Sequence, residues 1–159
     1  MMEEKEKAWK TVSSKYLFRR PWLTVRCEDM LLPNGNHIPE YYILEYPDWV
    51  NTIAITKDGK FVFVRQYRPR LGRTSYELCA GVCDKEDASP LVSAQRELWE
   101  ETGYGKGNWQ EYMVISANPS THTNLTHCFL ATNVEPIDHQ HLEDTEDLSV
   151  HLLTFEEVK

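Results

Sequence analysis

The sequence contains few cysteines and no long apolar run. Its four cysteines, at positions 27, 79, 83 and 128, form no Cys-x-x-Cys pair. They are expected to be free buried thiols, with a zinc site built from Cys79, Cys83 and a nearby histidine as an alternative. No apolar stretch approaches the length of a transmembrane helix, and the charged start, MMEEKEKAWK, lacks the apolar centre of a secretory signal. We therefore expect a cytoplasmic protein that has no membrane partner.

Basic residues are in deficit as well. The chain has 17 Lys and Arg against 25 Asp and Glu, which gives a formal net charge of −8. This balance, without any basic stripe, argues against binding of nucleic acid or of an anionic membrane surface. A small phosphate-bearing ligand is still compatible, because a bound metal ion and a few arginines can reverse the local field.

Three glutamates lie on one face of a predicted helix. Ser89 is suited to cap the start of this helix, and Gly103 is suited to end it, since glycine adopts the left-handed conformation without steric cost. Glu97, Glu100 and Glu101 are three and four residues apart, so the helical repeat brings their side chains together. Two carboxylates about 5 Å apart repel each other by roughly 3 kcal/mol at an effective dielectric constant of about 20.

The repulsion requires a positive partner. Arg96 can reach Glu100, but one arginine does not balance three glutamates. A hard divalent cation such as Mg²⁺ would balance them, whereas the alternative is a solvated acidic face. The metal interpretation is favoured because two apolar arcs flank the glutamates, formed by Leu91, Ala94 and Leu98 and by Val92 and Trp99.

Residues 81–104 resemble the signature of the Nudix hydrolases, which reads Gly, five residues, Glu, seven residues, Arg-Glu-x-x-Glu-Glu-x-Gly and an apolar residue. The second half matches from Arg96 onward. The first half departs, because its acidic position falls on Asp87, with Glu86 beside it, and one extra residue separates it from Arg96. The preceding run, Glu77-Leu-Cys-Ala-Gly, is similar to that of the ADP-ribose pyrophosphatase-like branch.

The resemblance implies an α/β fold, namely the Nudix α/β/α sandwich with a mixed sheet in residues 49–159. A small N-terminal antiparallel sheet in residues 1–48 would form a separate subdomain. The implied activity is Mg²⁺-dependent hydrolysis, with Mn²⁺ as a possible substitute, of a nucleoside diphosphate linked to another moiety. ADP-ribose or a related nucleotide sugar would give two monophosphates. The alternative is a catalytically degenerate Nudix module that binds nucleotides and regulates a partner.

The resemblance also implies roles for individual residues. The metal ligands would be Glu97, Glu100, Glu101, the carbonyl of Ala80 and, from an acidic loop before the last strand, Glu146. The catalytic residues would be the same three helix glutamates together with Glu143 as the base, for which Asp144 is the alternative.

Substrate contacts are expected from an arginine-rich segment. Four arginines fall within residues 65–73 of this acidic chain, and a guanidinium group fits phosphate oxygens. We expect Arg65 and Arg68 to bind phosphate, because they adjoin the end of a predicted strand; a solvated loop is the alternative. By resemblance, Glu77 lines the substrate pocket. Trp22 either stacks on the base or belongs to a dimer core.

The first quarter of the chain is predicted to form strands at residues 13–18, 23–31 and 38–46, with a turn at Pro33-Asn-Gly-Asn. Its apolar side exceeds what one hairpin can bury. It should therefore pack on the main domain or on a second subunit, and the resemblance favours a homodimer. Further strands are predicted at residues 50–56, 61–64, 110–116, 126–131 and 148–154, and a final helix is predicted to begin at residue 155.

Overall fold

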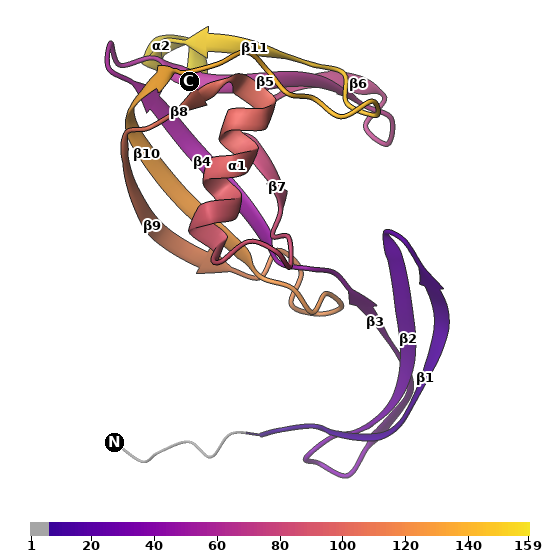
Figure 1. The fold of residues 1–159 in the computed structure, drawn as a ribbon. Helices are drawn as coiled ribbons and strands as arrows, with labels where there is room; N and C mark the ends of the chain where they lie inside the picture. Colours follow the sequence, from indigo (N-terminus) through magenta and orange to yellow (C-terminus); the bar gives the residue numbers. More distant parts are fainter. Residues whose placement is uncertain (1–6) are drawn as a thin grey trace, which may run out of the picture. The chain divides into compact units, whose positions relative to one another are not determined.

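The computed structural model describes residues 7–159 and divides the chain into two compact units. Of the described residues, the first unit contains 7–46 together with Ser116–Asn124, and the second contains Pro47–Ile115 and Leu125–Lys159 (Figure 1). The first six residues of the charged start lie outside the described residues. No helix within the described range is long and apolar enough to cross a membrane.

The first unit is an antiparallel sheet of three strands. The strands are β1 (Lys10–Arg20), β2 (Leu23–Leu31) and β3 (His37–Glu45), and β2 lies between the other two. Trp22, in the turn between β1 and β2, has a positive φ of 64°. Every residue of β1 is exposed, whereas most residues of β2 are half-buried, so β1 buries little of its apolar surface within the unit.

A loop that is distant in sequence also belongs to the first unit. The N–H group of Leu44 donates to the carbonyl of Thr121 at 2.7 Å, and the N–H group of Thr123 donates to the carbonyl of Leu44 at 3.1 Å. Residues 116–124 therefore extend the edge of the sheet beside β3. The sequence predicted only a break between strands here, because pairing with a distant edge leaves no local pattern.

The second unit is built on an eight-stranded mixed sheet. Its central order is β11-β5-β4-β10-β8; β6 pairs with β5, β7 with β4 and β9 with β10. The β10–β4 pair is parallel and the other pairs are antiparallel, which confirms the predicted mixed sheet. The strands are β4 Trp49–Thr56, β5 Phe61–Arg68, β6 Arg73–Glu77, β7 Cys79–Val82, β8 Tyr104–Gly105, β9 Asn108–Ile115, β10 Thr126–Pro136 and β11 Leu148–Leu153.

The sheet divides between β4 and β5. The two strands pair with each other only at Phe61 and Val62 of β5. Beyond that point β5 pairs with β6, and the first half of β4 pairs with β7. The strands therefore diverge toward the end of β5, which was predicted to end at Val64 but continues to Arg68.

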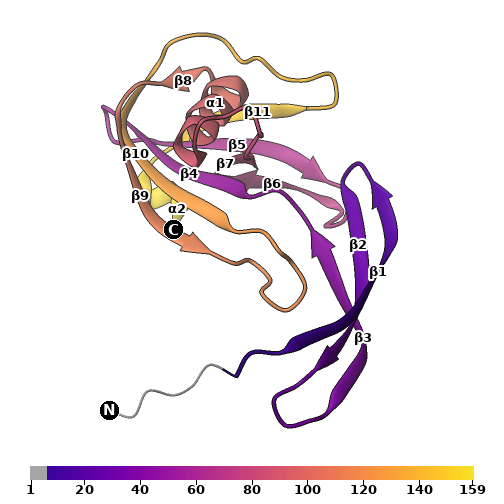
Figure 2. The same ribbon diagram turned by 60° about the horizontal axis from the view of Figure 1, so that its bottom comes forward.

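The helix α1 (Pro90–Thr102) packs on this sheet through Ala94 and Leu98, both fully buried. Ser89 caps its start by accepting a hydrogen bond from the N–H group of Val92, and Gly103 ends it at φ 71°, as predicted. Figure 2 shows the loop between β10 and β11 passing the C-terminal end of α1. The helices of the described chain are α1 and the single-turn helix α2 (Phe155–Val158).

Candidate functional site

Arg96 lies at the centre of the acidic face of α1. From one nitrogen, Nη1, it donates to Oε1 of Glu97 and to Oε2 of Glu100, at 2.9 Å each. Its Nε donates to Oδ2 of Asp87 at 3.1 Å, and its Nη2 donates to the carbonyl of Val82 at 3.0 Å. Burial lowers the pKa of Arg96, but the surrounding carboxylates together have the larger effect and hold this pKa above its ordinary value. Arg96 thus forms ion pairs with two of the three glutamates and connects the preceding loop to the helix.

The loop before α1 offers two acidic residues for the early position of the motif. Asp87 is partly buried and contacts Arg96, whereas Glu86 is exposed. Asp87 therefore supports the arginine that holds the glutamates, despite the extra residue in the loop.

Glu101 is in a different position from the other two glutamates. It is only 5% exposed, and its Oε2 atom has no hydrogen-bond partner among the described residues. Burial raises the pKa of Glu101 to about 7; contacts with Cys79 and the backbone of Ala80 oppose the shift, and the charge of Glu97 adds to it. A buried carboxylate oxygen without a partner is costly, so this position is suited to a cation.

Glu97 lies directly against Gly81 of β7. A Cβ atom at Gly81 would fall on the carboxylate of Glu97, so the close approach of helix and strand depends on the missing side chain. Burial raises the pKa of Glu97, and the charge of Arg96 opposes this effect. The glycine that opens the motif therefore positions one of its glutamates.

A cavity of about 450 Å³ lies where β4 and β5 diverge. Four predicted site residues line it, namely Arg68 from β5, Ala80 from β7, Glu101 from α1 and Glu146 from the loop before β11. The lining residues that sequence analysis missed are Gln66, Tyr67, Thr145, Asp147 and Leu148. Gln66 has a readable signal, because it is two residues before Arg68 on the same face of a strand. Tyr67 lies between Gln66 and Arg68 on β5, whereas Thr145, Asp147 and Leu148 reach the cavity through the way the loop before β11 folds back, which the sequence does not encode locally.

Arg68 and Glu77 form an ion pair beside this cavity. Nε of Arg68 lies 2.8 Å from Oε1 of Glu77, and Nε2 of Gln66 donates to Oε2 of Glu77 at 3.2 Å. The hydrogen bond from Arg68 lowers the pKa of Glu77. The Arg68 side chain is 47% exposed, and such pairs contribute about 1 kcal/mol or less. A phosphate group can therefore compete with Glu77 for the guanidinium group.

Two predicted substrate residues lie elsewhere. Arg65 is on the opposite face of β5 from Arg68, with its guanidinium group 5.7 Å from the centre of the Tyr76 ring. The structure therefore does not bring Arg65 to the cavity. Trp22 belongs to the first unit and is 78% exposed. Both of its alternative roles, base stacking and a dimer core, stay predictions.

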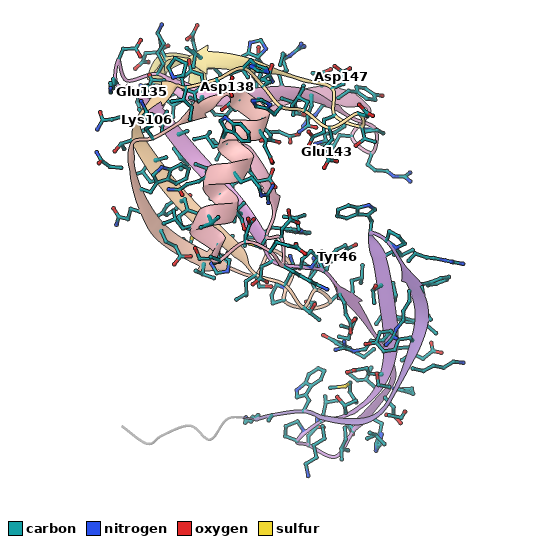
Figure 3. All side chains as sticks on the ribbon, in the orientation of Figure 1. Tyr46, Lys106, Glu135, Asp138, Glu143 and Asp147 are labelled. Atoms are coloured by element: carbon teal, nitrogen blue, oxygen red, sulfur yellow. The ribbon has the colours of Figure 1, made fainter. Side chains whose placement is uncertain are left out.

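The acidic loop supplies Glu146 to the cavity and Glu143 to the turn before it. The N–H group of Glu143 donates to Oε2 of Glu146, and the N–H group of Glu146 donates to the carbonyl of Glu143, at 2.9 Å each. The Glu143 side chain is exposed, and Figure 3 shows it on this loop together with Asp147. The assignment of the base to Glu143, with Asp144 as the alternative, stays a prediction.

The donors at the cavity fit a hard divalent cation. Oε2 of Glu101 lacks a partner, and Ala80 and Glu146 line the same space. Oxygen donors of this kind favour Mg²⁺ or Mn²⁺. In the described chain, the helix glutamates do not form a preassembled group of three converging oxygens. Glu97 and Glu100 would exchange their contacts with the guanidinium group for a cation.

Comparison with sequence families gave two matches along the chain. The profile described as the NUDIX domain matches residues 46–159. The profile described as the nucleoside diphosphate sugar hydrolase N-terminal domain matches residues 9–44.

Three relatives are similar over most of the chain. An ADP-ribose pyrophosphatase of Bacillus subtilis (strain 168) is 31% identical over 149 residues, covering 93% of this chain and 80% of the relative. A methanol dehydrogenase activator of Bacillus methanolicus is 33% identical, covering 77% and 65%. An ADP-ribose pyrophosphatase of Mycobacterium tuberculosis (strain ATCC 25618 / H37Rv) is 28% identical, covering 83% and 63%. The chain thus spans less than two thirds of the length of the last two relatives.

A solved structure described as an ADP compounds hydrolase has the same fold. It superposes with a TM-score of 0.82 over 97% of this chain and 82% of that chain, at 20% sequence identity.

Proposed function

The chain belongs to the Nudix hydrolase family, and from this premise we propose that it hydrolyses a nucleoside diphosphate linked to a sugar, with ADP-ribose ahead of other nucleotide sugars. Water adds to one phosphorus atom, the bond from that phosphorus to the bridging oxygen breaks, and two monophosphates are released. The observation that carries the proposal is the cavity that joins Arg68 to Glu101, Ala80 and Glu146. Two relatives are named ADP-ribose pyrophosphatase, which supports the choice of substrate.

Nudix hydrolases generally use divalent metal ions, and we assign Mg²⁺ to this site, with Mn²⁺ as a substitute. When bound, the cation supplies positive charge for the diphosphate and lowers the pKa of water. The residues that would hold it are Glu97, Glu100, Glu101, the carbonyl of Ala80 and Glu146. The unpartnered oxygen of Glu101 supports this assignment.

The remaining roles belong to residues around the cavity. Arg68 releases Glu77 and binds a phosphate oxygen, which its exposed ion pair permits. Glu77 stays at the wall of the pocket. Glu143 accepts a proton from the attacking water, with Asp144 as the alternative base. Arg96 orients Glu97 and Glu100 before the cation binds and takes no part in the bond changes.

A substrate panel tests the function. The full chain with Mg²⁺ is offered ADP-ribose, GDP-mannose, ADP-glucose, NADH, dinucleoside polyphosphates and dNTPs, and the products are identified. We expect ADP-ribose to give AMP and ribose 5-phosphate with the highest kcat/KM, and a chelator to abolish turnover. Equal turnover with and without metal would refute the mechanism, whereas a preference for dNTPs would refute the substrate class.

A regulatory module is the second candidate, because one relative is named for activation of another enzyme. Such a module would bind a nucleotide without turnover. The intact run from Arg96 to Gly103 and the buried Glu101 favour catalysis instead. Nucleotide binding by calorimetry, with no product over a long incubation, would favour the regulatory candidate.

We further propose a cytoplasmic homodimer. Free cysteines suit a reducing compartment. The first unit exposes large apolar side chains, including Val12 and Phe18 at 54% and 56%, and a second subunit would cover such a surface.

A further inference from the structure

A second group of metal-ligating side chains lies outside the cavity. Asp138, His139 and His141 each offer one ligand atom, and these atoms lie within 4.8 Å of one another. Among residues 7–159 this is the one such group of three or more His, Cys, Asp or Glu residues. Figure 3 shows Asp138 near the C-terminal end of α1. None of the three residues has a part in the proposed hydrolysis.

The carboxylate of Asp138 joins the two imidazole rings. Its Oδ1 lies 2.7 Å from Nδ1 of His139, and its Oδ2 lies 2.9 Å from Nε2 of His141. The N–H group of His139 also donates to Oδ1 at 2.8 Å. The two rings lie side by side, with their centres 4.3 Å apart. Two ring nitrogens therefore already face one carboxylate.

These distances are close to those of a metal site. At Zn–N and Zn–O distances of about 2.1 Å, ligand atoms of a tetrahedral site lie about 3.4 Å apart. The two O–N separations are about 0.7 and about 0.5 Å shorter than this, so the rings must move away from the carboxylate for one metal ion to replace the two hydrogen bonds. The His139 side chain is 79% exposed and that of His141 is 33% exposed. An ion can therefore enter from solvent and keep water as a further ligand.

The segment is fixed to the end of the helix. The backbone N–H group of His141 donates to the carbonyl of Glu100 at 2.8 Å, and Nε2 of the Gln140 side chain donates to the carbonyl of Glu101 at 2.7 Å. The ring of His141 lies 4.3 Å from that of Trp99. These bonds satisfy carbonyls that the end of a helix leaves free, and they hold the ligand-bearing segment in position before any ion binds.

We propose that Asp138, His139 and His141 bind one transition-metal ion of the Zn²⁺ class, at a site separate from the oxygen-lined cavity. Two imidazole nitrogens and a carboxylate suit Zn²⁺, Co²⁺ or Cu²⁺, whereas Mg²⁺ prefers oxygen ligands. Ligand chemistry thus separates the two sites. Because the segment caps α1, the bound ion stabilises the helix that carries the glutamates. The proposal stands independently of the reaction proposed above.

Calorimetry tests the site directly. The metal-free full chain is titrated with Zn²⁺ in the presence of excess Mg²⁺, as wild type and as His139→Ala and Asp138→Asn. His139→Ala leaves the helix-capping bonds of Gln140 and His141 in place. We expect one Zn²⁺ per wild-type chain and at least about tenfold weaker binding by both variants. Zn²⁺ should also raise the unfolding midpoint of the wild type but not that of His139→Ala.

His127→Gln is the matched control, because His127 is a partly buried histidine that also contacts carboxylates, those of Glu111 and Asp48. It should bind Zn²⁺ as the wild type does. Wild-type affinity in His139→Ala, or loss of binding in His127→Gln, would overturn the proposal. If Asp138 and the histidines are only hydrogen-bonded to one another, no stoichiometric binding is observed and the proposal fails.

Trp99 supplies a spectroscopic readout. Co²⁺ bound beside His141 should quench tryptophan fluorescence with saturation at one ion per chain, because the two rings are in contact. Trp99→Phe should remove most of this quenching without weakening Co²⁺ binding. A near-ultraviolet thiolate band in the Co²⁺ spectrum would place the ion on a cysteine and refute the assignment.

Discussion

Glu101 is the residue at which burial and charge conflict most directly. Its neighbours Glu97 and Glu100 share the guanidinium group of Arg96, whereas Oε2 of Glu101 is buried without a partner in the described chain. Removing a charge from water without a compensating bond is unfavourable. Among the helix glutamates of the described chain, Glu101 is the one with such an oxygen, which supports the proposal that it binds the cation.

The substitution Glu101→Gln tests this assignment. We expect kcat/KM to fall by at least about 100-fold, because the variant loses a negatively charged ligand. Glu156→Gln on α2, where the side chain is 77% exposed, should keep normal turnover. Steady-state kinetics and Mg²⁺ titration measure both effects. Turnover within a few-fold of wild type would remove Glu101 from the metal site.

Stability of the metal-free protein should depend on pH through the same carboxyl group. Its pKa is about 7 in the folded protein, above the ordinary value of 4.5. Between these values the folded state holds a proton that the unfolded state has lost. The free energy of unfolding therefore decreases as pH rises from about 4.5 to about 7, by about 3 kcal/mol.

Denaturant unfolding in the presence of a chelator, across this pH range, measures the effect. The difference between wild type and Glu101→Gln isolates it, since the glutamine has no proton to lose. The variant should become more stable relative to the wild type as pH rises. Parallel curves for the two proteins would contradict the raised pKa.

At the scale of elements, the site depends on a division of the sheet. β4 and β5 pair only near their shared turn, and β7 and β6 then occupy their facing edges. This divergence opens the space that the end of β5, β7 and α1 line together. β7 and α1 must also approach closely, and they do so where Gly81 faces Glu97.

Gly81→Ala tests this contact between strand and helix. Gly81 is not among the glycines with a positive φ, so alanine suits its backbone, but the new Cβ atom would displace the carboxylate of Glu97. We expect turnover to fall by at least about tenfold and Mg²⁺ binding to weaken. Circular dichroism should show retained secondary structure. Unchanged turnover with a retained fold would mean that the position of Glu97 is not critical.

At the scale of the whole molecule, the two units have different proposed roles, catalysis in the second and dimerisation in the first. The cavity and the helix glutamates belong to the second unit, and the first unit is a sheet with a fully exposed first strand. A three-stranded sheet needs a covered apolar face to be stable. A second copy of the chain is the partner that we propose.

Sedimentation at micromolar concentration should therefore show a dimer. Phe18→Asp, in the exposed β1, should shift the equilibrium to monomer, because it places a charge in the proposed interface. Phe18→Leu keeps an apolar side chain at the same position and serves as the control, which should remain a dimer. A wild-type monomer at these concentrations would refute the dimer.

Much of this protein is determined by sequence patterns that act locally. The alternation of apolar and polar residues predicted a strand at residues 50–56, which is β4, the caps Ser89 and Gly103 predicted α1, and the spacing of the glutamates placed them on one face. The family was recognised from residues 81–104, which match its signature fully from Arg96 onward, and the match over residues 46–159 confirms it. Each of these signals depends on neighbours within a few turns of the chain.

Only the tertiary structure decided which charged residues meet. Arg65 and Arg68 were both expected to bind phosphate, yet the divergence of β5 from β4 opens the cavity beside Arg68 and not beside Arg65. The equal-looking glutamates differ because Arg96 reaches two of them and leaves the third buried. Asp138, His139 and His141 come together because their segment folds onto the end of α1. Burial and long-range pairing set these differences, and neither is a property of the local sequence.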